Sequence, residues 1–354
     1  MESFRMAEPA LGLTNPDLNQ SVMPNTAPTV FEDFVRYGRQ SSAYFIFQKN
    51  VSCFHGRDGG RVHYGQQKTP LGPVNIVFTN PLCQSDGMKA LLEEFLAAQR
   101  IPTLFDPVDK EAADSLRELG YSINQIGCES RIILDDFELS GHKKKQLRHA
   151  SNFGKRHQCE VKELLWQQVD EAQVRNISIQ WLRSKGVNNR ELQYATRPPV
   201  YADEWQVRKF YCMQGERILA YVFFDPYYDN GKLAGYCANI LRSIPGKECG
   251  GALDFVILEA IKQFRLEGVP ELSLGVTPLQ NIQKEPGERR SIRLISKLFY
   301  EYGNSLYAFK GLAYHKSRYR PIETPWYFCT KDVSLLRAYW GILFGLKVLG
   351  GKEI

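Results

Sequence analysis

The same order of predicted elements occurs twice along the chain, and this repetition constrains the fold more than any other feature. Between Thr29 and Leu134, apolar periodicity and Gly-rich turns predict a hairpin, a strand, a helix, a strand, a helix and a final strand. The same order recurs between Val207 and Cys329. Because the two stretches share few identical residues, only the pattern repeats. A duplicated α/β unit explains that pattern most economically.

The length of the chain agrees with two domains, since 354 residues exceed the size of a typical single domain. We expect a flexible lead-in at residues 1–28, a first lobe at 29–138, a basic linking helix at 139–158, a second lobe at 159–330 and an apolar C-terminal helix at 331–354. The element order in each lobe resembles the N-acetyltransferase-like fold, in which two strands splay apart before the first core helix and admit an acyl donor. The predicted fold is therefore α/β (α+β), with two tandem units of this kind joined by a long basic helix. Within the second lobe, Phe210–Phe328 has the layout of the active half of an acyl-group transferase.

Eight cysteines are spread widely along the sequence, and none forms a C-x-x-C pair. A zinc site needs clustered ligands, and a disulfide framework belongs to small secreted domains. The spacing therefore predicts free thiols in a reducing compartment and no metal. The N-terminal residues lack the apolar core of a signal peptide, and no run of about 18 uncharged apolar residues predicts a transmembrane helix. We expect a cytoplasmic protein.

The most apolar stretch is the tail at Val333–Leu349, which Arg337 and Lys347 interrupt. One interpretation is a terminal helix docked on the core. The other is an interfacial helix that lies on a membrane, which would hold the protein peripherally at the inner membrane face.

Much of the net charge of +6 comes from one segment, Gly141–His157, which carries six basic residues and no acid. The basic residues are Lys143, Lys144, Lys145, Arg148, Lys155 and Arg156. The segment is predicted to be one helix that bridges the lobes. It either presents a solvated face or binds a polyanion such as the tRNA backbone or anionic lipid headgroups.

The strongest local feature is a strand, a Gly-rich loop and a helix at Leu233–Leu266. Unpaired N–H groups at a helix N-terminus carry partial positive charge, and Gly250 and Gly251 permit the close approach of a ligand. Such a loop can hold a pyrophosphate or an oxyanion. Acetyltransferases carry Arg/Gln-x-x-Gly-x-Gly/Ala at this place, which Lys247-x-x-Gly250-x-Ala252 matches loosely.

Two charged residues flank this loop. Asp254 in the first helical turn either stabilises the helix dipole or orients a nucleophile or an amino group. Arg242 at the end of the strand is either a surface charge or a clamp for phosphate or carboxylate.

A third cluster of charges lies in Phe309–Cys329, which is predicted to carry the last strands. Its charged residues are Lys310, His315, Lys316, Arg318, Arg320 and Glu323, and tyrosines interleave with them. The pattern suits binding of nucleic acid or lipid headgroups, and it equally fits an exposed strand with alternating faces.

Three stretches, in this order and spacing, resemble a known family. They are Leu139–Asn152 with Val161-Lys-Glu, then Asn239–Arg242, Gly251–Phe255 and Leu274–Leu279, and finally Phe309–Tyr327. Together they resemble the cytosolic C-terminal domain of phosphatidylglycerol lysyltransferases, the multiple peptide resistance factors, over roughly Phe31 to Cys329. The resemblance implies the tandem fold and the transfer of an aminoacyl group from aminoacyl-tRNA to a lipid hydroxyl, typically on phosphatidylglycerol. Because an aminoacyl ester is already activated, no cofactor is expected.

The resemblance also implies site residues. By position in the family's motifs, the catalytic candidates are Arg242, Asp254, Lys316 and Glu323. The residues expected to bind substrates are Lys143, Lys144, Lys145, Arg148, Lys310, Arg318, Gly250 and Gly251.

The sequence departs from the family at three points. Thr324-Pro325-Trp326 alters the ending that follows Glu323, and Thr79-Asn80-Pro81 replaces a Gly-Asp-Pro motif. The N-terminal membrane flippase of the full-length enzymes is absent from this sequence, so we expect either that the lipid is reached by binding at the membrane surface or that another acceptor is used.

Two other functions stay open at this point. One is an acyl-CoA-dependent N-acyltransferase on the same fold, which the loose match at Lys247 and Gly250 allows. The other is a non-catalytic module that binds lipid or RNA. The sequence also leaves open the amino acid, the acceptor lipid and the oligomeric state.

Overall fold

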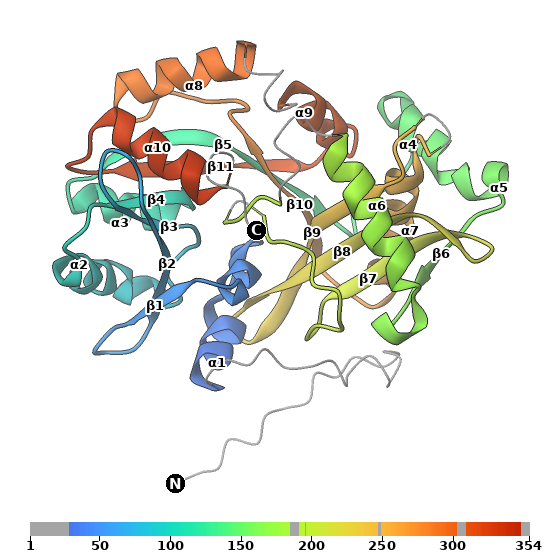
Figure 1. Cartoon of the computed structure of the whole chain (residues 1–354), viewed down its shortest axis with the longest axis horizontal. Coiled ribbons are helices and arrows are strands. Elements are labelled where there is room, and N and C mark those ends of the chain that lie inside the picture. Colours follow the sequence, from blue (N-terminus) through green and yellow to red (C-terminus); the bar gives the residue numbers. More distant parts are fainter. Residues whose placement is uncertain (1–27, 185–190, 195, 247–248, 303–308, 348–354) are drawn as a thin grey trace, which may run out of the picture.

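The computed structural model describes residues 28–184, 191–194, 196–246, 249–302 and 309–347. The predicted lead-in at residues 1–28 therefore lies almost entirely outside the described residues, as does Lys247. Within the described part, one 11-stranded sheet runs through the whole molecule, with helices on both of its faces (Figure 1). The architecture is mixed α/β, as predicted.

The elements follow one another in the order expected from the sequence, with differences given below. The strands are β1 (Ser52–His55), β2 (Arg61–Gln67), β3 (Val74–Val77), β4 (Thr103–Val108), β5 (Ser122–Ile133), β6 (Glu160–Glu163), β7 (Arg208–Gln214), β8 (Arg217–Asp229), β9 (Lys232–Ser243), β10 (Glu271–Pro278) and β11 (Ile322–Thr330). The α-helices are α1 (Pro28–Tyr37), α2 (Met88–Ala98), α3 (Lys110–Glu118), α4 (Lys145–Ser151), α5 (Phe153–His157), α6 (Glu171–Arg183), α7 (Ala252–Leu266), α8 (Arg290–Tyr302), α9 (Phe309–Ser317) and α10 (Leu335–Gly345). Short 3-10 helices are η2 (Ala43–Phe47), η3 (Ser85–Gly87), η4 (His142–Lys144) and η5 (Trp166–Gln168).

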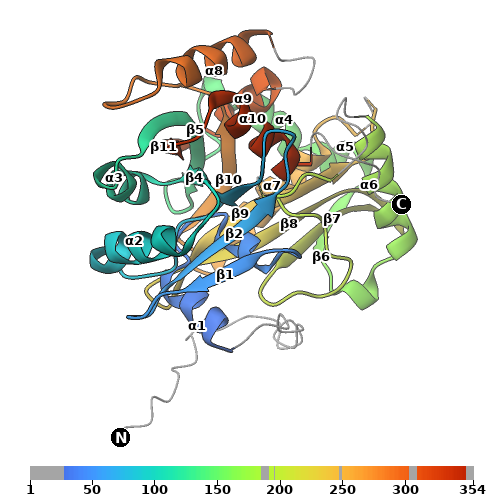
Figure 2. The ribbon, with the colours of Figure 1, turned by 60° about the vertical axis from the view of Figure 1, so that its left-hand side comes forward.

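The strand order across the sheet is β1-β2-β3-β4-β11-β5-β10-β9-β8-β7-β6. β3 and β4 are parallel neighbours that α2 connects, and β9 and β10 are parallel neighbours that α7 connects. The last strand of each half crosses into the other half. β5, which ends the first half, pairs with β10, and β11, which ends the second, pairs with β4. Figure 1 shows β1–β4 on one side of the molecule and β6–β9 on the other, with the crossing strands between them. Figure 2 brings the first half forward, so that β1 and β2 lie in front of β8 and β9 in that view.

Alternate side chains of the strands build a separate core on each face of the sheet. In the first half, Leu104 packs in the cluster under α10, whereas the neighbouring Phe105 packs against α2 and α3. In the second half, Val222 packs with α7 and the neighbouring Phe223 packs with α6. Because successive side chains of a strand point to opposite faces, a strand that is apolar throughout needs helices on both sides.

The apolar tail forms α10, which docks on the core of the first half. Gly341 lies against Val74 and Gly345 against Ile76, so closely that a Cβ atom at either glycine would be 2.6 Å from the neighbouring side chain. These two glycines therefore let the helix approach the sheet. Among the described residues, no helix combines the length and the apolar character needed to cross a membrane.

The prediction of one long basic helix is wrong. Gly141–His157 forms η4, α4 and α5 in succession, and the break follows Ser151. The Ser151 hydroxyl and the Asn152 amide both donate hydrogen bonds to the Arg148 carbonyl, at 2.8 and 3.2 Å. These side chains compete with the next backbone hydrogen bond and so favour a break.

The prediction of strands throughout Phe309–Cys329 is wrong in its first part. Phe309–Ser317 forms helix α9, and strand β11 begins only at Ile322. The buried residues Ala313 and Lys316 are three positions apart, which is the spacing of a helix face. The interleaved aromatic and basic residues concealed this spacing in the sequence.

Candidate active site

A buried carboxylate on α7 forms the centre of a polar cluster with α9. Asp254 Oδ1 accepts hydrogen bonds from Arg318 Nη2 at 3.1 Å and from the Tyr319 hydroxyl at 2.6 Å. Arg318 Nη1 forms an ion pair with Asp254 Oδ2 at 2.9 Å. Two of the residues predicted from the sequence, Asp254 and Arg318, are thus brought together in a two-pronged pair, which fixes both side chains.

His315 completes this cluster, although no motif in the sequence assigns it a catalytic role. Its Nδ1 lies 3.5 Å from Asp254 Oδ1 and also contacts Arg318 Nη2. Burial lowers the pKa of His315, and the attraction of Asp254 opposes this shift only in part. Because a guanidinium can only donate, we assign Nδ1 as the acceptor and place the proton of the neutral ring on Nε2.

Lys316 extends from α9 to the point where β9 and β10 separate. The last parallel pair between these strands is Ser273 with Cys237. Just beyond it, Lys316 Nζ donates hydrogen bonds to the carbonyl oxygens of Gly275 at 2.9 Å and Val276 at 3.0 Å. Burial lowers the pKa of Lys316 from 10.5 to about 8. The site therefore contains an ammonium group that loses its proton more readily than an ordinary lysine.

Glu129 lies next to this point, and sequence reasoning missed it. This fully buried carboxylate on β5 accepts hydrogen bonds from the Ser273 hydroxyl at 2.7 Å and from Trp326 Nε1 at 3.2 Å. The Ser273 hydroxyl accepts in turn from the Gly275 N–H at 3.0 Å. Gly275 has a φ of +76°, a conformation that favours glycine. The carboxylate thus helps to fix the irregular part of β10 on which Lys316 rests.

Glu323 lies on β11 and contacts a different loop. It accepts hydrogen bonds from Gln280 Nε2 at 2.8 Å and Asn281 Nδ2 at 2.6 Å. Both partners follow β10 in the chain. The structure therefore places Glu323 beside the end of β10, and its recorded partners are not those of Asp254.

Arg242 lies with α6 rather than with α9. Its guanidinium stacks on the Trp181 ring at 3.6 Å and donates a hydrogen bond to Glu191 Oε2 at 2.7 Å. The two terminal nitrogens of Arg242 thus have partners, whereas its buried Nε has none among the described residues.

The glycine loop before α7 is described only in part, because residues 247–248 lie outside the described residues. Gly251 is the N-cap of α7 and has a φ of +104°, which favours glycine. Gly250 beside it is exposed. The match of Lys247 to the acetyltransferase pattern also lies outside the described residues.

The basic segment lies on one side of α9, since Gln146 Nε2 donates a hydrogen bond to the Tyr314 hydroxyl at 2.8 Å. Lys143 and Lys145 are exposed. Lys144 donates to the Glu138 carbonyl at 2.6 Å, and Arg148 donates to the Leu139 carbonyl at 2.8 Å. Two of the four predicted basic residues therefore face solvent, and the other two hold the segment in place.

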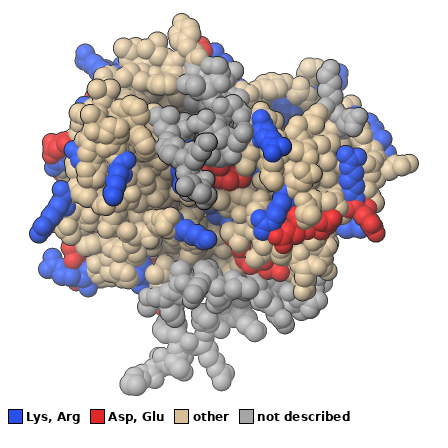
Figure 3. Space-filling model, in the orientation of Figure 1, with Lys and Arg blue, Asp and Glu red and all other residues tan. Residues whose placement is uncertain are grey.

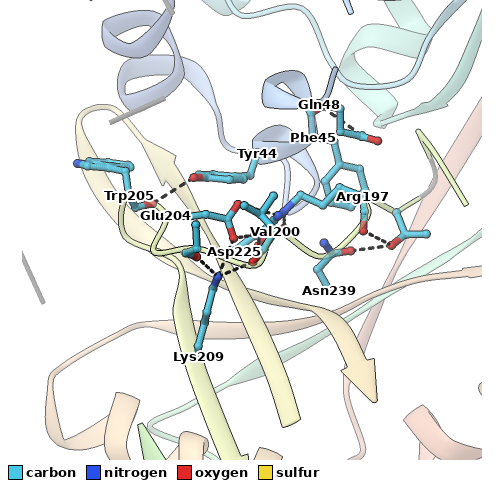
Figure 4. Close-up of polar contacts among 12 residues, drawn as sticks. Tyr44, Phe45, Gln48, Arg197, Val200, Glu204, Trp205, Lys209, Asp225 and Asn239 are labelled. Atoms are coloured by element: carbon cyan, nitrogen blue, oxygen red, sulfur yellow. Dashed lines mark hydrogen bonds and ion pairs between the residues drawn. The ribbon is translucent and has the colours of Figure 1, made fainter. Parts of the chain in front are cut away.

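A second group of buried charges fixes the segment between α6 and β7 (Figure 4). Arg197 Nε donates to Asp225 Oδ2 at 2.8 Å, and Arg197 Nη1 donates to Glu204 Oε1 at 2.8 Å. Lys209 Nζ donates to the Val200 carbonyl at 2.8 Å and pairs with Glu204 at 3.1 Å. Burial raises the pKa of Asp225, and Arg197 opposes this shift. The network holds the chain segment that carries Glu191, the partner of Arg242.

Comparisons with known proteins agree with one another. The family model described as "Phosphatidylglycerol lysyltransferase, C-terminal" matches residues 31–330. The phosphatidylglycerol lysyltransferase of Bacillus subtilis is 26% identical over 251 residues, which are 70% of this chain and 28% of that protein. The chain spans about a third or less of the length of the curated relatives that it matches.

Two solved structures share the fold over nearly the whole chain. The C-terminal domain of a putative lysylphosphatidylglycerol synthetase from Agrobacterium fabrum has a TM-score of 0.69 and 20% identity, and the match covers 90% of this chain and 95% of that one. The L-PGS structure from Bacillus licheniformis has a TM-score of 0.72 and 18% identity, with 93% and 98% covered.

Proposed function

Since the chain belongs to the family of phosphatidylglycerol lysyltransferase C-terminal domains, we propose that it transfers an aminoacyl group from an aminoacyl-tRNA to the hydroxyl group of a lipid such as phosphatidylglycerol. The observation that carries the proposal is the cluster that the buried Asp254 forms with the half-buried Arg318 and His315, beside the buried Lys316. Charged groups held in a fixed geometry can orient a nucleophile and stabilise developing charge without reorganisation.

In the proposed reaction, the oxygen of the lipid hydroxyl attacks the carbonyl carbon of the aminoacyl ester, and a tetrahedral oxyanion forms. The bond between that carbon and the ribose oxygen of the tRNA then breaks. The proton of the lipid hydroxyl ends on this ribose oxygen, so the exchange needs no oxidant, reductant or cofactor. Holding the two substrates in line supplies much of the rate.

We assign a separate role to each charged side chain. Asp254, held by Arg318, orients the attacking hydroxyl or the α-ammonium group of the aminoacyl donor, and Glu323 is a second candidate for this role. Protonated Lys316 stabilises the oxyanion or the lipid phosphate, because a cation in a buried site interacts strongly with an anion. Arg242 lies with α6 and not in this cluster, so its role is a separate one: its guanidinium, held by Trp181 and Glu191, would bind an anionic group of a substrate on that side of β9.

His315 takes part as a hydrogen-bond donor in this scheme. Its ring is neutral near pH 7 because burial lowers its pKa. With Nδ1 occupied by Arg318, the Nε2–H group is the one that can donate to the oxyanion.

The fold supports a way for the donor to enter. In each half, a helix (α2 or α7) connects two strands that pair in parallel, β3 with β4 and β9 with β10. This likeness supports two tandem N-acetyltransferase-like units, at residues 29–138 and 159–330, which exchange their last strands. β9 and β10 separate after Ser273 and would admit the aminoacyl end. The exposed Lys143 and Lys145 would contact the phosphate backbone of the tRNA.

Lipid analysis of cells tests this proposal. We expect a new ninhydrin-positive phospholipid when the chain is expressed in a bacterial host that lacks aminoacylated lipids. The Asp254→Asn variant should yield far less, because the neutral amide loses the ion pair with Arg318. Glu171→Gln, in the first turn of α6, is the matched control and should yield as much as the wild type.

A well-expressed, folded wild-type chain that yields no new lipid would contradict this proposal. Thermal stabilisation by acetyl-CoA in the same preparation would instead favour an acyl-CoA-dependent N-acyltransferase.

A further inference from the structure

Helix α8 exposes apolar side chains along one side, while Ile292 and Ser296 on the other side are buried. Leu294, Leu298 and Tyr302 have exposed fractions of 61%, 49% and 80%. They follow one another at intervals of four residues, so they form a continuous stripe along the helix. Phe299 is also exposed. An isolated exposed leucine needs no explanation, but a contiguous apolar stripe indicates a binding surface.

Basic side chains border this stripe. Arg290 and Lys297 of α8 are exposed and lie within one helical turn of Leu294. Lys310 at the start of α9 is exposed as well, and its ion pair with Glu301 at 2.9 Å ties α9 to the end of α8. Figure 3 shows the upper rim of the molecule, where α8 lies in Figure 1, as mostly uncharged, with basic side chains and a smaller acidic area at its margins.

We propose that the exposed stripe of α8 and the start of α9 form a docking face for a bilayer that contains anionic phospholipid. The apolar side chains insert into the boundary between headgroups and acyl chains, and the bordering cations contact anionic headgroups. Leucines flanked by lysine and arginine on one helix are typical of helices that lie in a membrane interface. The proposal rests on the proposed function for the identity of the lipid as a substrate.

The position of α9 connects this face to the candidate site. α9 has nine residues and is therefore about 13 Å long. Lys310 lies at its α8 end, and Lys316 near its other end reaches β10. A lipid headgroup drawn from a bilayer at α8 would thus have only the length of α9 to travel. The basic segment lies beside Tyr314 of the same helix, which leaves a separate surface for RNA.

RNA accounts less well for the face on α8. Phosphate groups are neutralised by lysine and arginine, and they gain nothing from exposed leucine side chains. A lipid surface uses both kinds of side chain, so the observed combination favours a bilayer.

Vesicle sedimentation tests the proposal. Wild-type protein should sediment with mixed phosphatidylcholine–phosphatidylglycerol vesicles, and the double variant Leu294→Ser/Leu298→Ser should partition on the order of tenfold less. The matched control is Leu71→Ser/Leu266→Ser, which changes two leucines with exposed fractions of 46% and 84% elsewhere on the surface. The control should partition like the wild type, and both double variants should melt like it because the changed side chains are exposed.

A second assay separates this proposal from the proposed function. With short-chain phosphatidylglycerol dispersed in detergent, Leu294→Ser/Leu298→Ser should keep wild-type turnover. Asp254→Asn should lose turnover and keep wild-type sedimentation with vesicles. If the wild type transfers nothing to any lipid, the proposed function fails, and the vesicle comparison still decides the docking face.

Several outcomes would overturn the docking face. Equal sedimentation of wild type and the Leu294→Ser/Leu298→Ser variant would do so, as would a wild type that stays in the supernatant. A change from oligomer to monomer in that variant, measured by light scattering, would identify the face as a protein interface. Loss of tRNA binding with unchanged sedimentation would assign the face to RNA.

Discussion

Among single residues, Lys316 is the one whose surroundings most directly change a chemical property, the pKa of its side chain. Its side chain leaves α9, enters the point where β9 and β10 separate, and donates to two carbonyl groups of β10. Burial disfavours the charged form, so the pKa is lowered to about 8. The residue is therefore cationic at neutral pH but close to losing its charge.

This property predicts the pH dependence of transfer. Only the protonated form can stabilise an anion, so the rate should be constant below the pKa of Lys316 and fall as pH rises through about 8. The Lys316→Met variant should lack this limb and turn over on the order of 100-fold more slowly. Initial rates from neutral to alkaline pH, corrected for spontaneous ester hydrolysis, measure it. A rate that rises through this range would mean that the neutral amine is the active form.

The lowered pKa of Lys316 also makes the free energy of unfolding depend on pH, in a direction that can be derived. Between about pH 8 and 10.5 the unfolded chain holds a proton on Lys316 that the folded chain has lost. The free energy of unfolding contributed by this residue therefore rises with pH across that window and is constant below it.

Other site residues show how far a sequence can predict a site. Asp254 and Arg318 lie in recognisable motifs, and the structure pairs them. Glu129 lies in no such motif, and its partners Ser273 and Trp326 are distant in sequence and meet it only because β5 crosses between the halves. Burial of a carboxylate by distant strands has no local signal that a sequence can carry.

Among the helices and strands, the basic segment carries the positive charge that the sequence indicates, but it is not the single helix that we predicted. Apolar Leu147, Ala150 and Phe153 recur at nearly helical spacing, which favours one continuous helix. The break depends on Ser151 and Asn152, whose side chains bond to the Arg148 carbonyl instead of to solvent. Hydrophobic periodicity does not register such competition, so the two short helices could not be predicted from it.

The exposed lysines of this segment give a prediction about salt. Lys143→Glu/Lys145→Glu should weaken tRNA binding and reduce the slope of log affinity against log salt by about 2, because two phosphate contacts are lost. The control Lys49→Glu/Lys68→Glu makes the same change of charge at exposed lysines of the first half. Filter binding across a salt series measures both slopes. An unchanged slope in the first variant would exclude this segment from the RNA contact.

At the scale of the whole molecule, the crossing of β5 and β11 joins the two halves into one sheet. β11 pairs with β4 on one side and β5 on the other, and β5 pairs with β10. Neither half can complete its sheet without a strand from the other. The repeated element order could be predicted from the sequence, but strand patterns indicate buried faces and do not identify neighbours, so the exchange could not.

This connectivity predicts that the chain unfolds as one unit. Hydrogen exchange of β3 in the first half and β8 in the second should become fast at the same urea concentration, since loss of either half removes a pairing strand from the other. Mass spectrometry of peptides from the two strands measures the midpoints. Two separate midpoints would show that the halves are independent domains.

The proposed reaction moves an aminoacyl group to lipid at the cluster around Asp254. The most direct measurement uses purified protein, tRNA charged with a labelled amino acid, and dispersed phosphatidylglycerol, and counts the label extracted with the lipid. We predict that the wild type and Glu171→Gln move the label into lipid and that Asp254→Asn is slower on the order of 100-fold while it stays folded. Label that remains on tRNA or appears only as free amino acid with the wild type, or equal transfer by Asp254→Asn, would contradict this proposal.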